Sequence, residues 1–481
     1  MLAFLRRWSK RPASDGAPSS EGRALRRLAI RGSLFELAGY AGNIGLRVIS
    51  SIVLRRLLSP EIMGLNLILD GLSLGLVLLS DVGIQQAVVQ SARGDEPVFL
   101  DTAWSIHVVR GWLLWVLACL LALPLAWAAG EPAFVWLVPL HSFSIVLMGF
   151  GSTAEFTLRR RLLPGRIVRN DLIAQLAMLA VSTTWASHDP SVRALVAGGV
   201  TSAAVRTALT YVLARDVGRR DRFRWDSQAR REIFEFGKWI TASSAVFFVS
   251  SWGDRLLVVA MLGTDTAGVY ATAILVAEAV GNALDRVIHG VFYPLFARVG
   301  REGLDALRVV YYQTRLRFDA LTLIATGVLA MTGPWVIGLF YDERYQAAGW
   351  MLRVLCVRSA TLCVVAPAET CLTSLGHTRY GFYQNVARAL WVLVAVPVGH
   401  ALGGVQGVVW AVALAGVPPL FVVWPKLREL GLLRLEREAL PVLFFALGAG
   451  LGWAIAHVLP DAVGIRAWLS ALPVRVEEAL R

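Results

Sequence analysis

Polar and charged residues at helical spacing inside apolar segments are the candidates for chemistry in this sequence. In the first two apolar segments they are Tyr40, Asn43, Arg47, Ser50, Asp70, Ser73 and Asp81. In a later pair of segments they are Ser244, Ser251, Asp254, Glu278, Asn282, Asp285 and His289. Residues three and four apart share one face of a helix. Each segment therefore carries a polar stripe along an otherwise apolar helix.

The charges in these stripes are candidates for lining a substrate cavity. Further single arginines lie in apolar segments at Arg255, Arg353, Arg358 and Arg388. A charge at the centre of a membrane helix costs about 2.5 to 3.5 kcal/mol on insertion scales, so it usually faces a bundle interior or a wet cavity. Guanidinium groups bind phosphate oxygens bidentately. Carboxylates can bind sugar hydroxyls or a coupling cation.

A structural explanation stays open for each single charge. Asp254 and Arg255 are adjacent and point about 100° apart, so we expect each to bind partners on other helices as a structural ion pair. His289 could relay protons, bind phosphate or simply be hydrogen-bonded. Because one-sided polarity recurs on four helices of two related pairs, the stripes together favour a shared hydrophilic cavity, in which the acids of the second segment face Arg47.

The composition is that of a polytopic membrane protein. Of the 481 residues, 56% are hydrophobic and 17% are charged, and the mean hydropathy is +0.59. Apolar runs of about 20 residues can cross about 30 Å of hydrocarbon as helices. They are too continuous for barrel strands, which alternate at every second residue. We therefore expect an all-α membrane protein with 13 or 14 spans.

The apolar runs place the spans and the domains. The predicted spans are 33–53, 62–83, 106–129, 133–153, 168–187, 192–214, 238–262, 267–297, 317–340, 347–373, 384–400, 402–425 and 439–459. The predicted domains are a basic cytoplasmic tail (1–32), a six-helix lobe (33–214), a cytoplasmic linker (215–237), a second six-helix lobe (238–425) and one or two extra helices with a tail (426–481). The tail has no uninterrupted apolar run, which argues against a cleaved signal peptide.

The basic residues predict an orientation. The net charge is +13, but Lys and Arg are spread over loops and do not form the single basic face that nucleic acid needs. With the amino terminus inside, thirty-two of them up to Arg437 fall on the cytoplasmic side. Four fall outside: Arg55, Arg56, Arg193 and Arg344. The positive-inside rule thus predicts a protein of the inner membrane with its amino terminus in the cytoplasm. The spread of the basic residues predicts no nucleic-acid partner.

A short turn recurs at nearly half the chain length. Leu57–Gly64 reads LLSPEIMG, and Met261–Gly268, 204 residues later, reads MLGTDTAG. Both have two apolar residues, a small residue, an acid at the fifth position and a final glycine. Self-similarity in the same direction within an apolar chain is typical of a transporter built from parallel repeats.

The sequence lacks several common catalytic motifs. It has no GxSxG, Walker or HExxH motif and no metal-binding pattern, and the four cysteines lack CxxC spacing. The expected outward loops are only a few residues long. We therefore expect a non-enzyme without cofactor or metal, energised by an H⁺ or Na⁺ gradient, the membrane potential or the substrate gradient.

Two stretches resemble bacterial polysaccharide flippases of the Wzx type, in the multidrug/oligosaccharidyl-lipid/polysaccharide (MOP) exporter superfamily. One is LLSPEIMGLNLILDGLSLGLVLLSDVGIQQAVVQ, which begins at Leu57. The other, within 234–298, carries Phe236-Gly237-Lys238, Gly253-Asp254-Arg255, the Gly263-to-Tyr270 turn and Pro294. The similarity extends over about residues 33–425 and indicates the family more specifically than the sugar.

The resemblance implies two six-helix lobes around a central cavity that alternates its access. It implies a substrate of oligosaccharide repeat units on undecaprenyl pyrophosphate, for exopolysaccharide, O-antigen or capsule synthesis, with a polymerase and glycosyltransferases as pathway partners. Five arginines would then attract the pyrophosphate: Arg47, Arg255, Arg353, Arg358 and Arg388. Tyr40 would stack on sugar, and the acids would bind hydroxyls or a cation. A multidrug antiporter of the same superfamily and, less favoured, a membrane polymerase or ligase are the alternatives.

Overall fold

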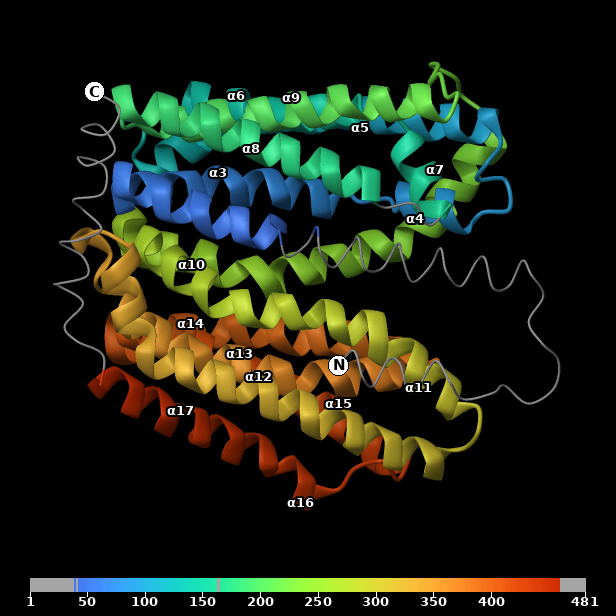
Figure 1. The fold of residues 1–481 in the computed structure, drawn as a ribbon. Helices are drawn as coiled ribbons and strands as arrows, with labels where there is room; N and C mark the ends of the chain where they lie inside the picture. The colour runs from blue at the N-terminus through green and yellow to red at the C-terminus, as the bar shows by residue number, and fades with distance from the viewer. Residues whose placement is uncertain (1–38, 40–41, 162–164, 459–481) are drawn as a thin grey trace, which may run out of the picture.

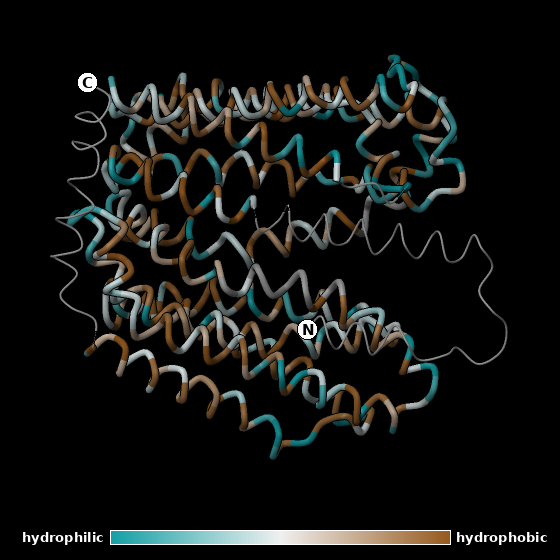
Figure 2. The backbone as a smooth tube through the Cα atoms, in the orientation of Figure 1, coloured by the Kyte–Doolittle hydropathy of each residue, from teal (hydrophilic) through white to brown (hydrophobic). Residues whose placement is uncertain are grey.

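The computed structural model describes residue 39, residues 42–161 and residues 165–458, without the side chains of several residues in 236–239 and 280–290. Tyr40, the whole predicted amino-terminal tail (1–32) and the region in which a fourteenth span would fall, after residue 458, lie outside the described residues. Every regular element in the described part is helical, as the sequence predicts. Figure 2 shows apolar residues along the helices and polar residues gathered at the connections.

The first lobe begins with a helix over residues 42–57. It continues with α3 (Pro60–Leu79), α4 (Ile84–Gln90), α5 (Pro97–Ala129), α6 (Phe134–Gly149), α7 (Ala154–Arg160), α8 (Gly165–His188) and α9 (Val192–Asp216). These helices form the upper group in Figure 1. A non-helical segment over residues 217–226 leads out of the lobe.

The second lobe is the lower group in Figure 1. Its elements are α10 (Ser227–Val287), a π-helix (Ile288–Phe292), α11 (Tyr293–Gly300), α12 (Leu304–Phe340), α13 (Ala348–Ser374), α14 (Arg379–Ala413), α15 (Pro418–Glu429), α16 (Leu435–Glu438) and α17 (Leu440–Val458), with short 3-10 turns at Glu343–Tyr345 and Leu414–Gly416. Two of these helices are double. The backbone leaves the helical region at Gly263 inside α10 and at Gly403 and Gly404 inside α14.

The observed helices match the predicted spans closely, but several are longer. Eight helical segments of the described residues are long and apolar enough to cross a membrane, or nine if the bent pair α6 and α7 counts as one span. The two double helices each count once there, although each covers two predicted spans. The helix over 42–57 and α8 fall outside that set, and α5 and α12 extend about two turns or more beyond the predicted 106–129 and 317–340.

The two copies of the recurring turn pack against each other. Ser59 accepts a hydrogen bond from the Ile62 backbone N–H and Pro60 occupies the first turn, so α3 starts sharply at this point. A Cβ on Gly64 would collide with the Thr264 carbonyl oxygen, and a Cβ on Gly268 would collide with the Pro60 carbonyl oxygen. Thr264 lies 204 residues after Pro60, and Gly268 lies 204 residues after Gly64. The repeats therefore cross as a pseudo-two-fold pair, and only glycine permits that approach.

The helix bundle has two ends, which we name by their connections. The turn end carries the connections at 130–133, 189–191, 263–264 and 341–347, and the linker end carries those at 91–96, 217–226, 301–303 and 376–378. The lobes diverge toward the linker end, on the right of Figure 1.

Hydrogen bonds join the lobes at both ends of the bundle. Near the linker end, Ser91 and Arg93 donate to Glu232, and the Thr241 hydroxyl donates to the Asp81 carbonyl. A second set of hydrogen bonds lies at the turn end. They join Arg55 Nε to Thr272 Oγ1 (2.7 Å), the hydroxyls of Ser51 and Tyr341 (3.2 Å), the Tyr345 hydroxyl to the Leu58 carbonyl (3.1 Å) and Arg56 Nε to the Phe340 carbonyl (3.2 Å). Leu58 and Tyr345 are fully buried there. Along the rest of the molecule, α3 and α10 form the most extensive contact between the lobes.

The extra carboxyl-terminal helix belongs to the second lobe. The α17 helix packs along α12, and a buried polar group fixes its start. Arg315 donates to Glu438 at 2.5 Å and to Asp319 at 2.9 Å, and the Tyr312 hydroxyl lies 3.2 Å from Glu438. Because both acids share one arginine away from water, removing Arg315 would leave them without a positive partner.

Candidate functional site

Four of the predicted site residues form one ionic cluster inside the second lobe. Asp254 and Arg255 lie on the arm of α10 before Gly263, and Glu278 lies on the arm after it. Arg358 reaches the cluster from α13 and lies 2.9 Å from Glu278 and 3.6 Å from Asp254. Arg255 lies 3.0 Å from Glu278 and 3.7 Å from Asp254. The cluster thus joins three helical arms, and the neighbouring Asp254 and Arg255 bind other helices more closely than each other, as expected.

The cluster is buried and balanced in charge. Asp254 is 1% exposed and Arg358 is 5% exposed. The Tyr270 hydroxyl donates to Asp254 Oδ2 at 2.5 Å, and Arg255 also lies over the Trp252 ring at 5.0 Å. The negative charges of two acids balance the positive charges of two arginines here, as buried charges require. The side chain of Glu278 is the most open of the four, at 27% exposure.

Arg388 is the arginine that the cluster leaves unmatched. It lies on α14, close enough to Arg358, Glu369, Asp254 and Glu278 to interact with them electrostatically. It is half-buried, and its Nε has no hydrogen-bond partner within the described residues. Its positive charge lies outside the neutral cluster, where Glu369 is the neighbouring acid. Because the Arg388 side chain is only half-buried and forms no ion pair within 4 Å among the described residues, we treat it as a candidate contact for an anionic ligand.

The first lobe holds a smaller polar group around Asp70. Asn66 donates to Asp70 at 2.8 Å, one turn away on α3, and His141 Nε2 on α6 lies 3.3 Å from Asp70. The Asp70 side chain is 46% exposed, whereas that of His141 is 11% exposed. This carboxylate is consequently accessible, unlike Asp254.

Asp81 does not continue the helical face of Asp70. Helix α3 ends at Leu79, and Gly83 takes a left-handed conformation after it. The Asp81 carboxylate accepts from the Gly83 backbone N–H at 2.9 Å, which closes a local turn beyond the helix. The sequence-based placement of Asp70 and Asp81 on one face was wrong, because the periodic pattern runs on past the point where the backbone leaves the helix.

Asp81 instead borders a cavity inside the first lobe. The cavity has a volume of about 270 Å³ and lies near the linker end. Its charged or ionisable lining residues are Asp81, His107, Arg110, Glu155 and Arg206. Arg206 lies 3.3 Å from Glu155 and 2.9 Å from Asp171, so its charge is matched within the lobe.

Arg47 does not meet the acids of α3. It is exposed on the helix over 42–57, and no ion pair involves it within the described residues. Asn43, one turn earlier, is half-buried. Arg353 is exposed on α13, five residues before the buried Arg358 and apart from the ionic cluster. The expectation that the α3 acids face Arg47 was wrong for Asp70, which binds Asn66 and His141.

Three predicted residues have a described backbone but no described side chain. Asn282 and Asp285 lie in α10, and His289 lies in the π-helix after it. A π-helix inside a longer helix often marks a functional position. No group of three or more His, Cys, Asp or Glu residues within the described part of the chain is arranged to hold a metal ion.

Sequence reasoning did not find Tyr270, His141 or Glu155 as parts of these groups. Tyr270 stands inside the recurring turn motif, but its hydroxyl reaches Asp254 only because α10 folds back at Gly263. His141 lies in a predicted span without a polar stripe, and Glu155 lies just beyond the end of that span. Their partners come from other helices, so helical spacing carries no signal for them.

Comparison with known proteins identifies the family. The model of a family described as "Polysaccharide biosynthesis protein" matches residues 53–349, more than half of the chain. The chain belongs to this family. The family match includes the recurring turn, the ionic cluster residues on α10 and, apart from Ser51, the residues that make the contacts at the turn end.

Individual relatives and solved structures agree with that family. The chain is 24% identical to the lipopolysaccharide biosynthesis protein WzxC of Escherichia coli over 80% of this chain and 78% of the relative. It is 22% identical to the succinoglycan biosynthesis transport protein ExoT of Rhizobium meliloti, with the same coverage. Its fold resembles that of the lipid II flippase MurJ in an inward closed conformation, with a TM-score of 0.63, 10% identity and coverage of 93% and 100%. Transporters of the MOP superfamily share this fold.

Proposed function

We propose that this protein is a flippase that moves oligosaccharide repeat units linked to undecaprenyl pyrophosphate from the inner to the outer leaflet of the cytoplasmic membrane. Membership in the polysaccharide biosynthesis family and likeness to WzxC and ExoT support a role in polysaccharide export. The observation that carries the proposal is the half-buried Arg388, which forms no ion pair within 4 Å among the described residues, beside a buried ionic cluster in a two-lobed membrane protein. That arrangement offers positive charge to a pyrophosphate within the membrane.

The orientation follows from the basic connections. The linker end carries most of the Lys and Arg in the connections, so we place it and the amino terminus in the cytoplasm. The turn end then faces the periplasm. A glycosyltransferase would supply the lipid-linked unit at the linker end, and a polymerase would consume it at the turn end.

Alternating access is supported by the gradient of burial along the first helix. Ser51, Leu54 and Leu58 are buried at the turn end, whereas Gly42, Gly45 and Arg47 are exposed toward the linker end. The first helix is therefore packed at the turn end and open toward the linker end, where the contact between the lobes is made instead by α10, through Arg93 and Glu232. We assign this arrangement to an inward-facing state, in which Arg47 is an accessible first contact for the pyrophosphate.

Export in a deletion strain tests the substrate assignment. We expect Arg388→Gln to reduce polymer export at least about tenfold and to cause lipid-linked oligosaccharide to accumulate in the inner leaflet, because a charge-assisted contact to phosphate contributes about 1.5 to 3 kcal/mol. Arg317→Gln is the matched control, since Arg317 is an exposed arginine on α12. Full export by Arg388→Gln at a normal protein level would remove Arg388 from the site. Export of cationic dyes without any effect on polymer would favour the multidrug antiporter.

Crosslinking tests the alternating access. A short bifunctional thiol reagent applied to the Ser51→Cys/Tyr341→Cys variant should lock the turn end and block export, and a cleavable reagent should restore export on reduction. The single Ser51→Cys variant controls for modification. Continued export by the crosslinked protein would contradict closure of the turn end as part of the cycle.

The energy source is proposed to be an H⁺ or Na⁺ gradient. Asp70 is a candidate carrier, because its half-exposed carboxylate lies beside His141 and can be reached by a proton or a cation. Flipping in vesicles with an imposed gradient of each ion measures this coupling. Equal rates with and without both gradients would leave the substrate gradient as the driving force.

A further inference from the structure

We propose that the linker segment over residues 220–225 is a binding site for anionic phospholipid headgroups of the cytoplasmic leaflet. The segment reads Arg-Asp-Arg-Phe-Arg-Trp. Its place at the cytoplasmic face rests on the orientation proposed above, whereas its lipid chemistry rests on the contacts that follow.

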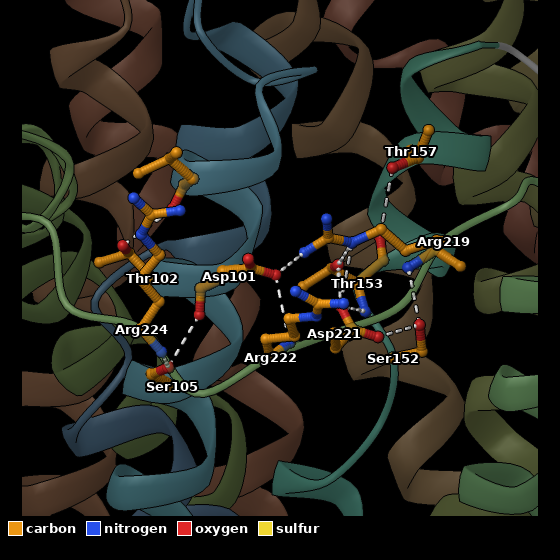
Figure 3. Close-up of polar contacts among 12 residues, drawn as sticks. Asp101, Thr102, Ser105, Ser152, Thr153, Thr157, Arg219, Asp221, Arg222 and Arg224 are labelled. Atoms are coloured by element: carbon orange, nitrogen blue, oxygen red, sulfur yellow. Dashed lines mark hydrogen bonds and ion pairs between the residues drawn. The ribbon is translucent and has the colours of Figure 1, made fainter.

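The segment is held rigidly against the first lobe, as Figure 3 shows. Three backbone N–H groups donate to α5: that of Arg222 to Asp101 (3.2 Å), that of Arg224 to Ser105 Oγ (2.8 Å) and that of Asp226 to Thr102 Oγ1 (3.1 Å). These bonds use the backbone alone. They leave the side chains of Arg222 and Arg224 free to bind elsewhere.

A buried ionic group secures the start of the segment. Asp221 accepts from the hydroxyls of Ser152 and Thr153, each at 2.5 Å, and its side chain is 1% exposed. Arg219 binds Asp101 and lies 3.2 Å from Asp221. The backbone of the linker is therefore fastened to the lobe, and its exposed side chains project from a defined place on that lobe.

The exposed face of this segment is both aromatic and basic. Phe223 is 59% exposed and Trp225 is 49% exposed, and their rings meet edge to face at 5.9 Å. Arg220, Arg222 and Arg224 are also exposed, and no ion pair involves them within the described residues. In a connection bathed by water alone, two large exposed aromatic side chains would be unfavourable. Aromatic rings with neighbouring arginines are favoured at a membrane interface, where the rings enter the headgroup layer and the arginines bind phosphate.

The contact with α5 places the segment at the depth of that layer. Ser105, which holds Arg224, lies on the same face of α5 as Trp112, two turns away and about 10 Å along the axis. Trp112, Leu113 and Val116 are 42%, 65% and 48% exposed, so this face of α5 turns toward lipid. The segment thus lies directly below a lipid-facing surface.

Charge complementarity selects anionic lipid as the occupant. Three arginines and one buried, already matched aspartate leave a positive outer face. Anionic headgroups in the cytoplasmic leaflet attract such clusters, each basic residue adding to the affinity near the surface. A neutral headgroup would meet the aromatic rings but would not neutralise the arginines.

Quenching of Trp225 fluorescence in vesicles tests the proposal. The full-length protein is reconstituted in phosphatidylethanolamine vesicles that contain either phosphatidylglycerol or phosphatidylcholine with a spin label near the headgroup. The signal of Trp225 is the difference between the wild type and Trp225→Phe. We expect phosphatidylglycerol to quench this signal more efficiently, and the Arg222→Gln/Arg224→Gln variant to lower that preference roughly fivefold or more.

Arg230→Gln/Arg231→Gln is the matched control, because it removes two exposed arginines from α10 outside the segment. It should retain the preference for phosphatidylglycerol. An equal preference in the Arg222→Gln/Arg224→Gln variant, or a Trp225 signal that neither lipid quenches, would overturn the proposal; the second result would assign the face to a cytoplasmic protein. Thermal unfolding of each variant checks folding. Because quenching requires no transport, a negative result here would leave the flippase function untouched. Likewise, a loss of the flippase assignment would leave the lipid-binding result untouched.

Discussion

The two lobes share a turn but not their charges. At the constant offset of 204 residues, Gly64 corresponds to Gly268, and both make the close backbone crossing between the lobes. At the same offset, Asp254, Arg255 and Glu278 correspond to Ser50, Ser51 and Leu74. Asp70 in turn corresponds to Ile274. The repeat has therefore preserved the backbone geometry, while each lobe carries its own polar chemistry.

The different placement of charged residues suggests different roles for the two lobes. The second lobe buries a neutral cluster of two acids and two arginines, whereas the first lobe leaves Asp70 and Arg47 accessible. Buried matched charges hold helices in register and are costly to disturb. Accessible charges contribute little to stability and can meet a ligand. Substitutions in the two lobes should consequently separate stability from transport.

The largest effect is expected at Arg358. Arg358→Ala would leave Asp254 and Glu278 short of a counter-charge inside the second lobe, and breaking a buried pair in this way costs about 3 to 5 kcal/mol. Thermal unfolding of the purified protein should show a strongly lowered Tm. Arg47→Ala in the first lobe should leave the Tm unchanged. Similar Tm values for both variants would contradict the view that charges stabilise the second lobe more than the first.

A smaller loss is expected for Asp254→Asn. The amide can still accept from Tyr270 but no longer balances the arginines, and hydrogen bonds to charged groups contribute about 1.5 to 3 kcal/mol. Stability should fall more than transport, because Asp254 is buried behind Arg255 and Arg358. Unfolding curves in detergent and export per folded molecule measure the two effects. A wild-type unfolding curve together with lost export would place Asp254 in the substrate site instead.

The shared turn predicts equal effects in both lobes. Gly64→Ala and Gly268→Ala each place a methyl group against a carbonyl of the opposite repeat, and such overpacking costs about 1 to 3 kcal/mol. Both should lower the Tm to a similar extent. Gly45→Ala is the control, since a Cβ at Gly45 meets no atom within 4 Å. Unequal decreases in Tm would show that the two halves of the pseudo-two-fold crossing are not equally tightly packed.

The smallest effect on stability is expected at Asp70. Asp70→Asn removes a half-exposed charge whose partners are Asn66 and His141, and such pairs contribute about 1 kcal/mol or less. The Tm should change little, while export should fall if the carboxylate binds substrate or ion. Leu74→Ala on the same helix controls for repacking. A large drop in Tm would show that the first lobe also uses its acid structurally.

Much of the fold could be predicted from the sequence. The apolar runs of helical length predict the membrane helices, and the motif at Leu57–Gly64 and Met261–Gly268 predicts the repeat. Long apolar runs have few alternatives in a membrane, because every backbone polar group must be satisfied within the segment. Helix ends were less certain. Asp81 shows why, since its spacing fits α3 although the helix stops at Leu79.

The site could be predicted only in part. Arg255, Arg358, Asp254 and Glu278 were candidates from sequence, and the structure brings them together, while their contact with substrate stays a prediction. The partners of Asp70 could not be found in this way, because His141 lies on another helix. Helical spacing reports which residues share a face, not which faces meet.

Local composition and spacing were enough to predict the membrane class, the succession of helices and the repeat, and the orientation that they predict stays a prediction. The tertiary structure alone decided which charges are neutralised, which remain accessible and where the linker lies. Asp254 and Asp70 look alike in sequence, each an acid in an apolar helix. One is matched by Arg358 from α13, and the other is half-open beside His141. That distinction arises from contacts between distant segments, which no local pattern contains.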